Sequence, residues 1–560
     1  MIPLADSTIR TRWELKTRAD LYTTWAAFSD TDQFARVNKS GFSFKEEVQS
    51  DGSILRTGAM KQMGMKFTWD ELPFQYRAPT WWKNTRVFHQ GPAAKVTTTL
   101  HLHPEDDGTA VRYTVDVTPR NALIKPMVSL NFAATMKPKI GRTLAALIAN
   151  LDDSSAAYEP PPPPMSLEAE GRLEEVSERL GVPEVTVRLL AFLRRAPLAK
   201  QNRMDPLMLA RQWELPPDDV VSGMLRATEE GLLAIRWVLI CPSCMAPKAA
   251  LGAEEAHCPS CNITYDGSFP DSVAVYFRPS DAIRDFELRM DCIGSPARQP
   301  HVLAQDVLLP TAEVEFTLPL AGGVYRLRTV PPTGTASLEV REDAPTVSLD
   351  MTADGEKLEP PLLRAVPGMT TLTVRNTSQR PMTVMLERRW RPPGLLTAGH
   401  TLEKFPNARK LLPVGTIQSD FTAYRAAVLA LTGMSADESL PLPEGSKLLY
   451  QSERGLVAVF STPEEALRGL RGLGDLGMLS AGLAVGPVME VNLEGHSVPM
   501  GEAVDTALEV MYSAGPGVAA MLVDLEAEGD IRQSLADTAC TLVPAAYTGV
   551  GDRPVHWLAF

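Results

Sequence analysis

Apolar and polar residues alternate over most of residues 6–152, which is the pattern of half-buried β-strands. The alternation is found in TIRTRWEL, KFTWDEL, TRVFHQG, AKVTTTLHLHP and TAVRYTVDVTP. Two stretches have helical spacing instead: ADLYTTWAAFSDTDQFARV near the start, and the long segment from Leu123 to Leu151 at the end. Residues 1–152 are therefore expected to form a curled antiparallel sheet that grips a long C-terminal helix.

The spacing becomes helical over residues 166–240, and the last two predicted helices are followed by the apolar strand LLAIRWVLI. This order predicts a winged-helix-like module. The second of these helices carries Asp218, Asp219 and Glu229, opposed by Arg226. A helix that reads DNA needs basic or amide side chains. The sequence therefore favours a protein-interaction module over a transcriptional regulator.

Residues 264–395 alternate again between Gly and Pro turns, which predicts a small antiparallel β-sandwich. Five consecutive prolines, Pro160 to Pro164, precede the helical region and cannot continue a helix or a central strand. Residues 153–165 are expected to be a semi-rigid linker. The predicted modules are 1–152, 166–240, 241–263, 264–395 and 411–560, in an α+β multidomain chain.

The composition is that of folded domains. Hydrophobic residues make up 44% and charged residues 22% of the 560 residues, which excludes a disordered or fibrous chain. No apolar run approaches the roughly 18–20 residues that span a bilayer, so no membrane span is expected. The N-terminus lacks the apolar core of a secretory signal, and the default expectation is a cytoplasmic protein.

The net charge of −13 is unevenly distributed. Residues 1–152 hold 20 basic and 15 acidic side chains, a balance of +5, whereas residues 411–560 hold 7 basic and 19 acidic, a balance of −12. Such an acidic surface repels nucleic acid and nucleotide phosphates unless a metal or a basic cluster intervenes. No nucleic-acid partner is expected.

Four of the six cysteines form the pattern CxxC–x13–CxxC. Two such short turns bring four thiolates to one tetrahedral ion, and this spacing predicts a structural Zn²⁺ in a zinc ribbon over residues 241–263. A pair of redox dithiols is the competing interpretation. Cys292 and Cys540 are isolated and are expected to be buried apolar residues. The predicted zinc ligands are Cys241, Cys244, Cys258 and Cys261.

Residues 1–152 resemble the START-like (SRPBCC, polyketide cyclase/dehydrase) superfamily. The matching features are the helix from Trp25 to Asn38, the element from Trp69 to Phe74, and the hairpin at Asp106-Asp107-Gly108. The resemblance implies a helix-grip fold that holds an apolar small molecule between sheet and helix. The alternative, that the tryptophans of this region simply fill a core, stays open.

The middle of the chain resembles an uncharacterised domain of bacterial proteins. The resemblance rests on Gly231-Leu-Leu, the two CPSC motifs, Asp271-Ser-Val and Tyr276-Phe-Arg. In those relatives a class III nucleotide cyclase domain commonly follows. The resemblance implies a context, not an activity.

Residues 411–560 resemble such a cyclase domain, with a ferredoxin-like α/β fold implied. The match includes a first strand at Thr416–Phe421, a central hairpin with its helix at Ser452–Ala466, and the stretch Gly482–Val510, in which a helix begins at Gly501. The order of elements is better preserved than the chemistry.

Cyclases of this class hold two metal ions with two aspartates. Asp420 falls at the first of these positions, but Arg454 stands at the second and would repel a metal. Where the family carries Asn and Arg on the helix, this chain has Asp505 and Glu509, which reverses the charge that stabilises a transferring phosphoryl group. The resemblance implies a catalytically dead homologue. The alternative is an adenylate or guanylate cyclase that is active only with a partner chain.

These features together predict a non-enzymatic signalling or scaffold protein. The START-like domain would bind an apolar molecule, the zinc ribbon would brace the middle, and the cyclase-like domain would bind a protein partner or form a homodimer.

Overall fold

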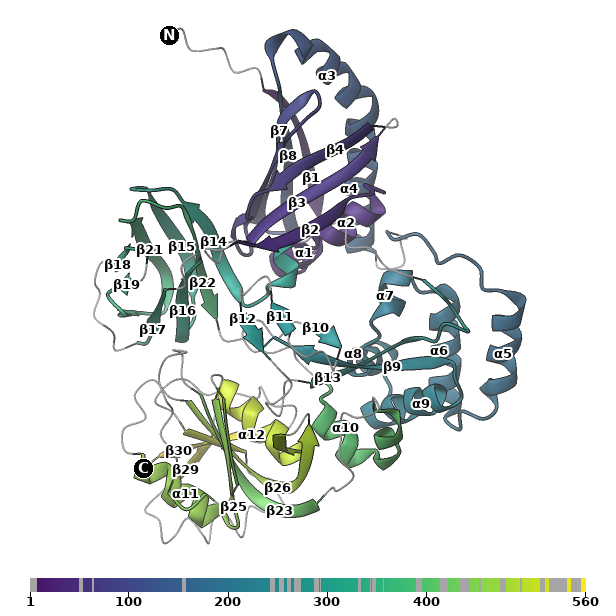
Figure 1. Ribbon diagram of the computed structural model, residues 1–560, viewed down its shortest axis with the longest axis vertical. Helices are drawn as coiled ribbons and strands as arrows, with labels where there is room; N and C mark the ends of the chain where they lie inside the picture. Colours follow the sequence, from purple (N-terminus) through teal and green to yellow (C-terminus); the bar gives the residue numbers. More distant parts are fainter. Residues whose placement is uncertain are drawn as a thin grey trace. The chain divides into compact units, whose positions relative to one another are not determined.

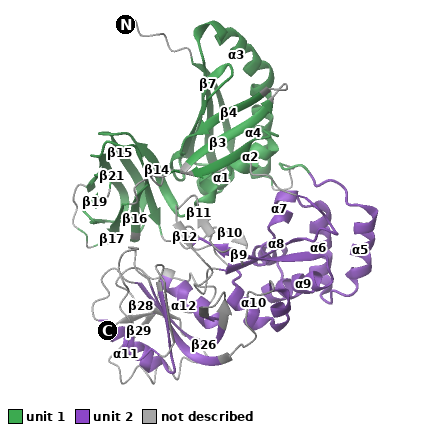
Figure 2. Cartoon of the chain, in the orientation of Figure 1, with its two compact units in different colours: residues 1–160, 289–388 green, residues 161–288, 389–560 purple. Residues whose placement is uncertain are grey.

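The structure is a computed structural model (Figure 1). It divides into two compact units, residues 1–160 with 289–388 and residues 161–288 with 389–560, and each is described by itself (Figure 2). No helix among the described residues is long and apolar enough to cross a membrane. The described residues are 8–49, 54–62, 65–153, 158–241, 247–250, 256–258, 263–265, 273–286, 292, 294–330, 334–342, 344, 349–355, 357–388, 395–412, 422–432, 444–446, 448–452, 455–473, 480–493, 496–513, 519–522, 541–544 and 555–559.

The first unit begins with a curved antiparallel sheet that packs on a long helical run. The strands lie in the order β1-β8-β7-β6-β5, and β4, β3 and β2 continue from β6. The elements are β1 Ile9–Thr17, α1 Leu21–Ser29, α2 Thr31–Val37, β2 Ser43–Val48, β3 Ile54–Gln62, β4 Met65–Glu71, β5 Gln75–Arg77, β6 Trp81–Phe88, β7 Ala93–Glu105, β8 Gly108–Pro119, η1 Ala122–Ile124, α3 Lys125–Asn131, η2 Phe132–Met136 and α4 Lys137–Asp152.

The long helix packs on the sheet as the sequence predicted. Ile140, Leu144 and Leu147 of α4 are buried in one cluster with Leu100 and Tyr113 of the sheet. The residues of α4 recur at intervals of three and four, which places them on one helix face. Alternate residues of each strand meet them, because strand side chains alternate between the two faces of a sheet. The predicted sheet-and-helix arrangement of residues 1–152 is confirmed.

The single helical pattern near the start divides into two helices. Asp20 caps α1, since its side chain accepts hydrogen bonds from the backbone N–H groups of Tyr22 and Thr23. Asp30 ends α1 and caps α2 by accepting from the N–H of Gln33. Asp is a favoured N-cap residue, so the second cap breaks the continuous helix that the spacing alone suggests.

The β-sandwich follows within the same unit. One sheet has the order β14-β22-β16-β17-β20 and the other β15-β21-β18-β19, with an apolar core between them. The strands are β14 Val302–Leu308, β15 Glu313–Leu320, β16 Gly323–Val330, β17 Thr335–Val340, β18 Leu349–Ala353, β19 Leu358–Glu359, β20 Leu362–Ala365, β21 Gly368–Asn376 and β22 Met382–Arg388, and the short helix η3 Pro296–Arg298 precedes them.

The sandwich and the N-terminal domain share a sheet. β14 pairs with β5, placing Gln305 opposite Tyr76, and Arg77 forms a 2.9 Å ion pair with Asp306. The guanidinium of Arg77 also lies 4.2 Å from the ring centroid of Phe316. Pairing with β14 gives hydrogen-bond partners to the backbone N–H and C=O groups at the edge of β5, which would otherwise be unpaired. Two regions that the sequence presents as separate modules are therefore joined by backbone hydrogen bonds.

The predicted start of the sandwich needs correction. The strand β13 (Val273–Pro279) falls inside the predicted module 264–395, yet it pairs with β9 (Leu233–Ile240) of the helical module. All but one of its side chains are buried. Alternation and turn residues predict a strand here but contain no information on its partner, so the sandwich proper begins at Val302.

The second unit begins with a helical module. Its helices surround an apolar core that also takes in α10, so residues 395–412, which precede the C-terminal domain, complete this module. The elements are α5 Leu167–Ser177, α6 Pro183–Arg195, α7 Leu198–Asn202, α8 Pro206–Trp213, α9 Pro217–Glu229, β9 Leu233–Ile240, β10 Pro247–Ala250, β11 Ala256–Cys258, β12 Ile263–Tyr265, β13 Val273–Pro279, α10 Ala398–Lys404 and η4 Pro406–Leu411. Two helices followed by a strand, α8, α9 and β9, occur in the predicted order, and the winged-helix-like classification stays a prediction.

The C-terminal domain is a mixed sheet in the order β24-β25-β23-β26-β28-β30-β29, with β27 beside β26. The elements are β23 Thr422–Thr432, β24 Leu448–Ser452, β25 Gly455–Phe460, α11 Pro463–Gly472, β26 Ser480–Leu493, β27 His496–Met500, α12 Glu502–Ser513, β28 Ala519–Leu522, β29 Thr541–Pro544 and β30 Val555–Ala559.

The two described helices of this domain cover opposite faces of the sheet. Ala427 and Leu429 of β23 pack in the cluster of α11, whereas Ala426 and Val428 pack in the cluster of α12. Burial of both faces explains why β23 is apolar without alternation. The ferredoxin-like fold of the whole domain stays a prediction.

Candidate functional site

The N-terminal domain contains a buried carboxylate, Glu71, in a set of three donors. The Oε2 of Glu71 accepts hydrogen bonds from Trp69 Nε1 at 2.6 Å and Arg86 Nε at 2.9 Å, and its Oε1 accepts from Asn84 Nδ2 at 2.8 Å. The Glu71 side chain is 1% exposed. A carboxylate at such depth is tolerated only with charge and hydrogen-bond compensation, which these donors provide.

Strand alternation places this group, called the Glu71 cluster, on the face of the sheet that α4 covers. Along β6, Trp82, Asn84 and Arg86 point to the same side, and Trp82 packs in the core cluster of α4. Glu71 lies directly opposite Arg86 in the β4–β6 pairing. A polar group therefore lies in the interior of an otherwise apolar domain.

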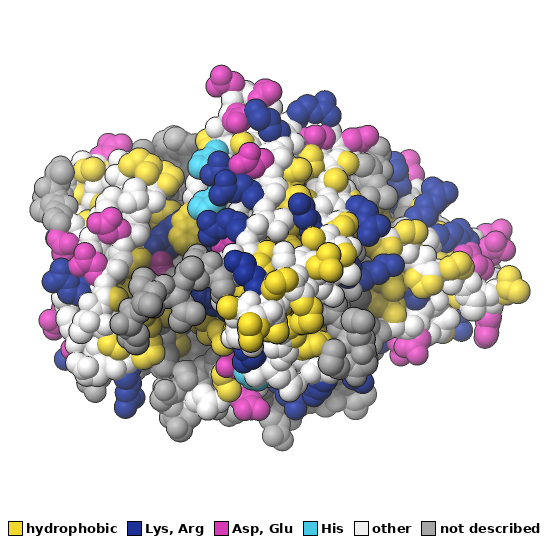
Figure 3. Space-filling model, turned by 90° about the horizontal axis from the view of Figure 1, so that it is seen from above, with side chains coloured by type: hydrophobic (Ala, Val, Ile, Leu, Met, Phe, Trp, Pro, Cys, Tyr) yellow, Lys and Arg dark blue, Asp and Glu magenta, His cyan; other side chains and the backbone are white. Residues whose placement is uncertain are grey.

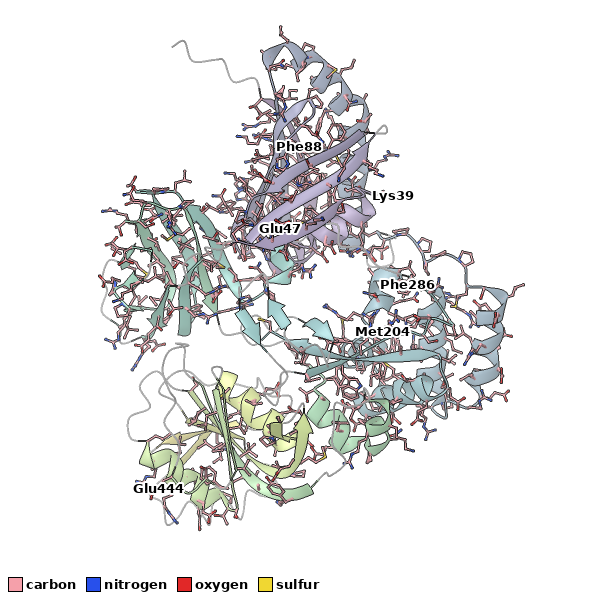
Figure 4. The ribbon with its side chains drawn as sticks, in the orientation of Figure 1. Lys39, Glu47, Phe88, Met204, Phe286 and Glu444 are labelled. Carbon is pink, nitrogen blue, oxygen red and sulfur yellow. The ribbon has the colours of Figure 1, made fainter. Side chains whose placement is uncertain are left out.

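Aromatic rings surround the Glu71 cluster. The Arg86 guanidinium lies 4.6 Å from the ring centroid of Phe42 and 5.5 Å from that of Trp69. Phe88, labelled in Figure 4, packs against Trp69 with centroids 5.4 Å apart. Cation–π contacts of this kind stabilise a desolvated guanidinium. Burial alone would lower the pKa of Arg86, but the neighbouring acidic groups, Glu71 first among them, together leave that pKa raised.

The Glu71 cluster has donor capacity left over. The Arg86 side chain is 20% exposed, and its Nη1 makes no hydrogen bond within the described part of the chain. Tyr113 on β8 is buried in the same core, and burial raises the pKa of its hydroxyl, which is neutral at physiological pH. The Nη1 of Arg86 therefore remains as a donor for an acceptor that the described residues do not supply.

Cys292 and Ser295, near the start of residues 289–388 of the first unit, pack against the N-terminal domain. The N–H of Cys292 donates to Asp32 Oδ1 at 2.9 Å, and its Sγ contacts Thr31 Oγ1 at 3.0 Å. Ser295 Oγ donates to the Ser29 carbonyl at 2.7 Å. Burial raises the pKa of Cys292 to about 12, which keeps it a neutral thiol. The prediction that Cys292 is a buried residue is confirmed; Cys540 lies outside the described residues.

A second buried carboxylate lies in the sandwich. Glu387 is paired with Arg326 at 2.5 Å and Arg328 at 2.7 Å, and His301 lies 3.7 Å away. Burial alone would raise the pKa of Glu387, but the two guanidinium groups outweigh it and hold the pKa well below its ordinary 4.5. Arg328 is 4% exposed and Arg326 is 24% exposed, so the cluster reaches solvent only partly, at Arg326.

The predicted zinc ligands are placed only in part. Cys241 directly follows β9 and is buried, and Cys258 ends β11; Cys244 and Cys261 lie outside the described residues. The first CxxC falls between the paired strands β9 and β10, and the second spans the end of β11 and the connection to β12. β10 and β11 are neighbours. The described strands on either side of each CxxC motif pair with each other, which is compatible with a four-thiolate metal site.

The two predicted metal positions of the cyclase-like domain, Asp420 and Arg454, lie outside the described residues. The neighbouring described elements are β23, which begins at Thr422, and the paired strands β24 and β25. The loss of a two-metal site stays a prediction.

The acidic residues of α12 take part in a junction within unit 2. Asp505 Oδ2 accepts a 2.6 Å hydrogen bond from Thr397 Oγ1, and Thr397 also caps α10. The carboxylate of Glu403, on α10, accepts from the N–H of Glu502 at the start of α12. Gly501 before it has φ +130°, a conformation that favours glycine. Asp505 therefore ties the C-terminal domain to the helical module.

Glu509 lies one turn further along α12 and is half-buried. The helix does begin directly after Gly501, as predicted, so the sequence locates the element correctly. It does not reveal that α10 would contact the start of this helix, because the packing of distant segments is not encoded in local spacing.

The Glu71 cluster was not identified from the sequence. One feature of the sequence indicates it. In Trp82-x-Asn84-x-Arg86-x-Phe88, two polar residues lie between two aromatic ones at every second position of the strand. Alternation assigns all four to the buried face. Polar residues at predicted core positions are therefore the signal that could have located it.

The comparisons with known proteins cover parts of the chain. A family model described as a family of unknown function (DUF5939) matches residues 169–291. The comparison with curated proteins gave no match. Among solved structures, the chain is similar to the Zhui aromatase/cyclase from Streptomyces sp. R1128, with 11% identity, 27% of this chain and 99% of that chain covered, and a TM-score of 0.21. Protein TTHA0849 from Thermus thermophilus aligns with 16% identity over 26% of this chain and 99% of its own, with a TM-score of 0.20. Protein Mll3558 from Rhizobium loti aligns with 20% identity over 25% of this chain and 98% of its own, with a TM-score of 0.19.

Proposed function

We propose that the N-terminal domain binds a small, largely apolar molecule between its sheet and α4, and that the chain acts as a non-enzymatic signalling or scaffold protein. The observation that carries the proposal is the Glu71 cluster, a buried ion pair with an unused donor in an apolar interior. Ligand sites combine apolar walls with a few polar groups that fix orientation.

The unused donor defines the ligand class. Nη1 of Arg86 can only donate, so the ligand offers a hydrogen-bond acceptor. Glu71 already neutralises Arg86, which favours a neutral carbonyl oxygen over a second carboxylate. The half-buried aromatic residues Trp13, Trp25 and Phe34 pack against the same core and would contact the apolar part.

A fluorescence titration tests this binding. The probe is N-phenyl-1-naphthylamine, a neutral apolar dye, and a neutral aromatic ketone is the competitor. We expect Arg86→Met to retain dye binding but to weaken displacement by the ketone at least about tenfold, since a charge-assisted hydrogen bond contributes about 1.5–3 kcal/mol. Arg56→Met is the matched control, because Arg56 pairs with Glu46 on the β2–β3 hairpin of the same domain. Equal ketone affinity in the wild type, Arg86→Met and Arg56→Met would refute the proposal that Arg86 binds the ligand's acceptor.

For the C-terminal domain, we propose a catalytically dead cyclase homologue that binds a protein partner or forms a homodimer. The acidic residues Asp505 and Glu509 on α12, and the use of Asp505 in the junction with Thr397, support it. Cyclase assays with ATP and GTP plus Mn²⁺ test it. Metal-dependent cyclic nucleotide above a heat-killed control, lost in Asp420→Ala, would establish the alternative of a cyclase that needs a partner chain.

For the four cysteines, we propose a structural Zn²⁺. The support is chemical, since four thiolates suit this ion and the described strands on either side of each CxxC motif pair with each other. Elemental analysis is expected to give about one zinc per chain, lost in Cys241→Ser and in Cys258→Ser. Cys540→Ser is the control and should retain the metal. A metal-free chain that is folded would contradict the proposal.

A further inference from the structure

The helical run at the end of the N-terminal domain carries an exposed apolar stripe. Leu123 is 91%, Met127 56% and Leu130 73% exposed. Met127 and Leu130 are three residues apart in α3, which places them on one side of that helix, and Leu123 precedes them in η1. Val128 and Phe132 are buried on the opposite side, against the domain core. The stripe is therefore not part of the core, and large apolar side chains exposed in a group mark an interaction surface.

The same segment is strongly basic. Between Asp116 and Asp152 the chain contains five basic residues and no acidic one. The basic residues are Arg120, Lys125, Lys137, Lys139 and Arg142. Figure 3 views the molecule from above Figure 1, from the end at which α3 lies, and hydrophobic side chains there lie beside Lys and Arg. This one-sided charge contrasts with the net charge of −13 for the whole chain.

We propose that residues 120–142 form a docking surface for an anionic membrane, with Leu123, Met127 and Leu130 inserted among the lipids. A helix with an apolar stripe and neighbouring Lys and Arg lies in the plane of the interface, where the apolar side chains leave water and the cations meet anionic headgroups. The helix lies on the surface and does not cross the bilayer, in agreement with the absence of a spanning helix among the described residues. The proposal does not depend on ligand binding by the Glu71 cluster.

A second copy of the chain fits this surface less well. A two-fold dimer places the same patch of both subunits face to face. Five basic residues would then oppose five others with no acidic residue of the segment to pair with them. An anionic bilayer supplies both the apolar layer and the opposite charge.

Vesicle sedimentation with the full chain tests the proposal. The probes are vesicles of phosphatidylcholine alone and of phosphatidylcholine mixed with phosphatidylglycerol. We expect the protein to bind the anionic vesicles preferentially and to bind less as the ionic strength rises. The double variant Leu123→Ser with Leu130→Ser should bind at least about tenfold more weakly, since two large apolar side chains no longer leave water.

The matched control is the double variant Leu167→Ser with Met369→Ser, because these residues are 93% and 71% exposed elsewhere in the chain. It should bind like the wild type. A second pair of variants tests the contribution of charge to vesicle binding. Lys137→Glu should weaken binding to anionic vesicles more than Lys45→Glu on β2 does.

The proposal is overturned if the wild type binds neither kind of vesicle, or if the two double variants bind equally. Concentration-dependent dimerisation in analytical ultracentrifugation, lost in the Leu123 and Leu130 double variant without any vesicle binding, would assign the stripe to a second copy instead. Vesicle-independent capture of an acidic protein by the same stripe would also overturn it.

Discussion

Two buried glutamates of the first unit have the same depth but different surroundings. Glu387 in the sandwich is compensated by two arginines, Arg326 and Arg328, whose side chains are 24% and 4% exposed. Glu71 in the N-terminal domain has a single arginine, Arg86, whose side chain is 20% exposed. At Glu387 two guanidinium groups share one carboxylate, with Arg326 Nε on Oε2 and Arg328 Nε and Nη2 on Oε1. At Glu71 the Nη1 of the single arginine makes no hydrogen bond within the described part of the chain, and this is the donor that we propose for binding.

The largest effect is expected for Glu387→Gln. This change leaves the buried guanidinium group of Arg328 and the partly exposed one of Arg326 without their carboxylate, and we expect the free energy of unfolding to fall by about 3–5 kcal/mol. Urea unfolding followed by circular dichroism measures it. Glu313→Gln is the control, since Glu313 pairs with Arg375 on an exposed strand and should change stability by less than about 1 kcal/mol. An equal effect of both changes would show that Glu387 is not a stabilising centre.

Glu71→Gln should cost less, about 1–3 kcal/mol, because the amide still offers an oxygen to Trp69 or Arg86 while one donor loses its acceptor. The same urea experiment measures it. A loss of stability as large as that of Glu387→Gln would remove the distinction between the two glutamates and assign Glu71 a purely structural role.

Acid titration sharpens the comparison further. The pKa of Glu387 is lowered in the folded state, so its contribution to stability is present above about pH 4.5 and is lost as the pH falls towards the folded-state pKa. Between about pH 5 and about pH 3, the stability of the wild type should fall more steeply than that of Glu387→Gln. Parallel pH profiles for the two proteins would contradict the assigned ion pairs.

The smallest effect is expected for a half-exposed carboxylate, Asp505. Asp505→Ala removes the acceptor of the Thr397 hydroxyl and should destabilise the second unit by about 0.5–1.5 kcal/mol. Asp505→Asn retains an acceptor oxygen and should lie close to the wild type. Thermal unfolding resolves the two variants. If Asn is as harmful as Ala, the negative charge and not the hydrogen bond holds the junction.

The sequence predicted individual elements of the N-terminal domain better than their pairing. Alternation located β1, β4, β6, β7 and β8, and helical spacing located α4. It missed β2 and β3, since SFKEEV and ILRTGAMKQ carry polar residues on a face with little burial. The partners of β5 and β13 could not be predicted, because an edge strand looks the same whichever chain segment pairs with it.

The candidate sites show the same difference between local features, which the sequence predicts, and contacts between distant segments, which it does not. The CxxC motifs are local, so the sequence alone yields a metal hypothesis with named ligands. The Glu71 cluster depends on β4 lying beside β6, and the junction of Asp505 depends on α10 reaching α12. Such sites arise from contacts between distant segments, and for these a sequence offers at most polar residues at positions where apolar ones are expected.

The central claim is that the Glu71 cluster holds a small molecule. Native mass spectrometry of the full chain, purified from its own cells, tests it most directly. We predict a bound organic molecule in the wild type and in Arg56→Met, and its loss in Arg86→Met. A wild-type protein that carries no such molecule, or an Arg86→Met protein that retains it fully, would contradict the account.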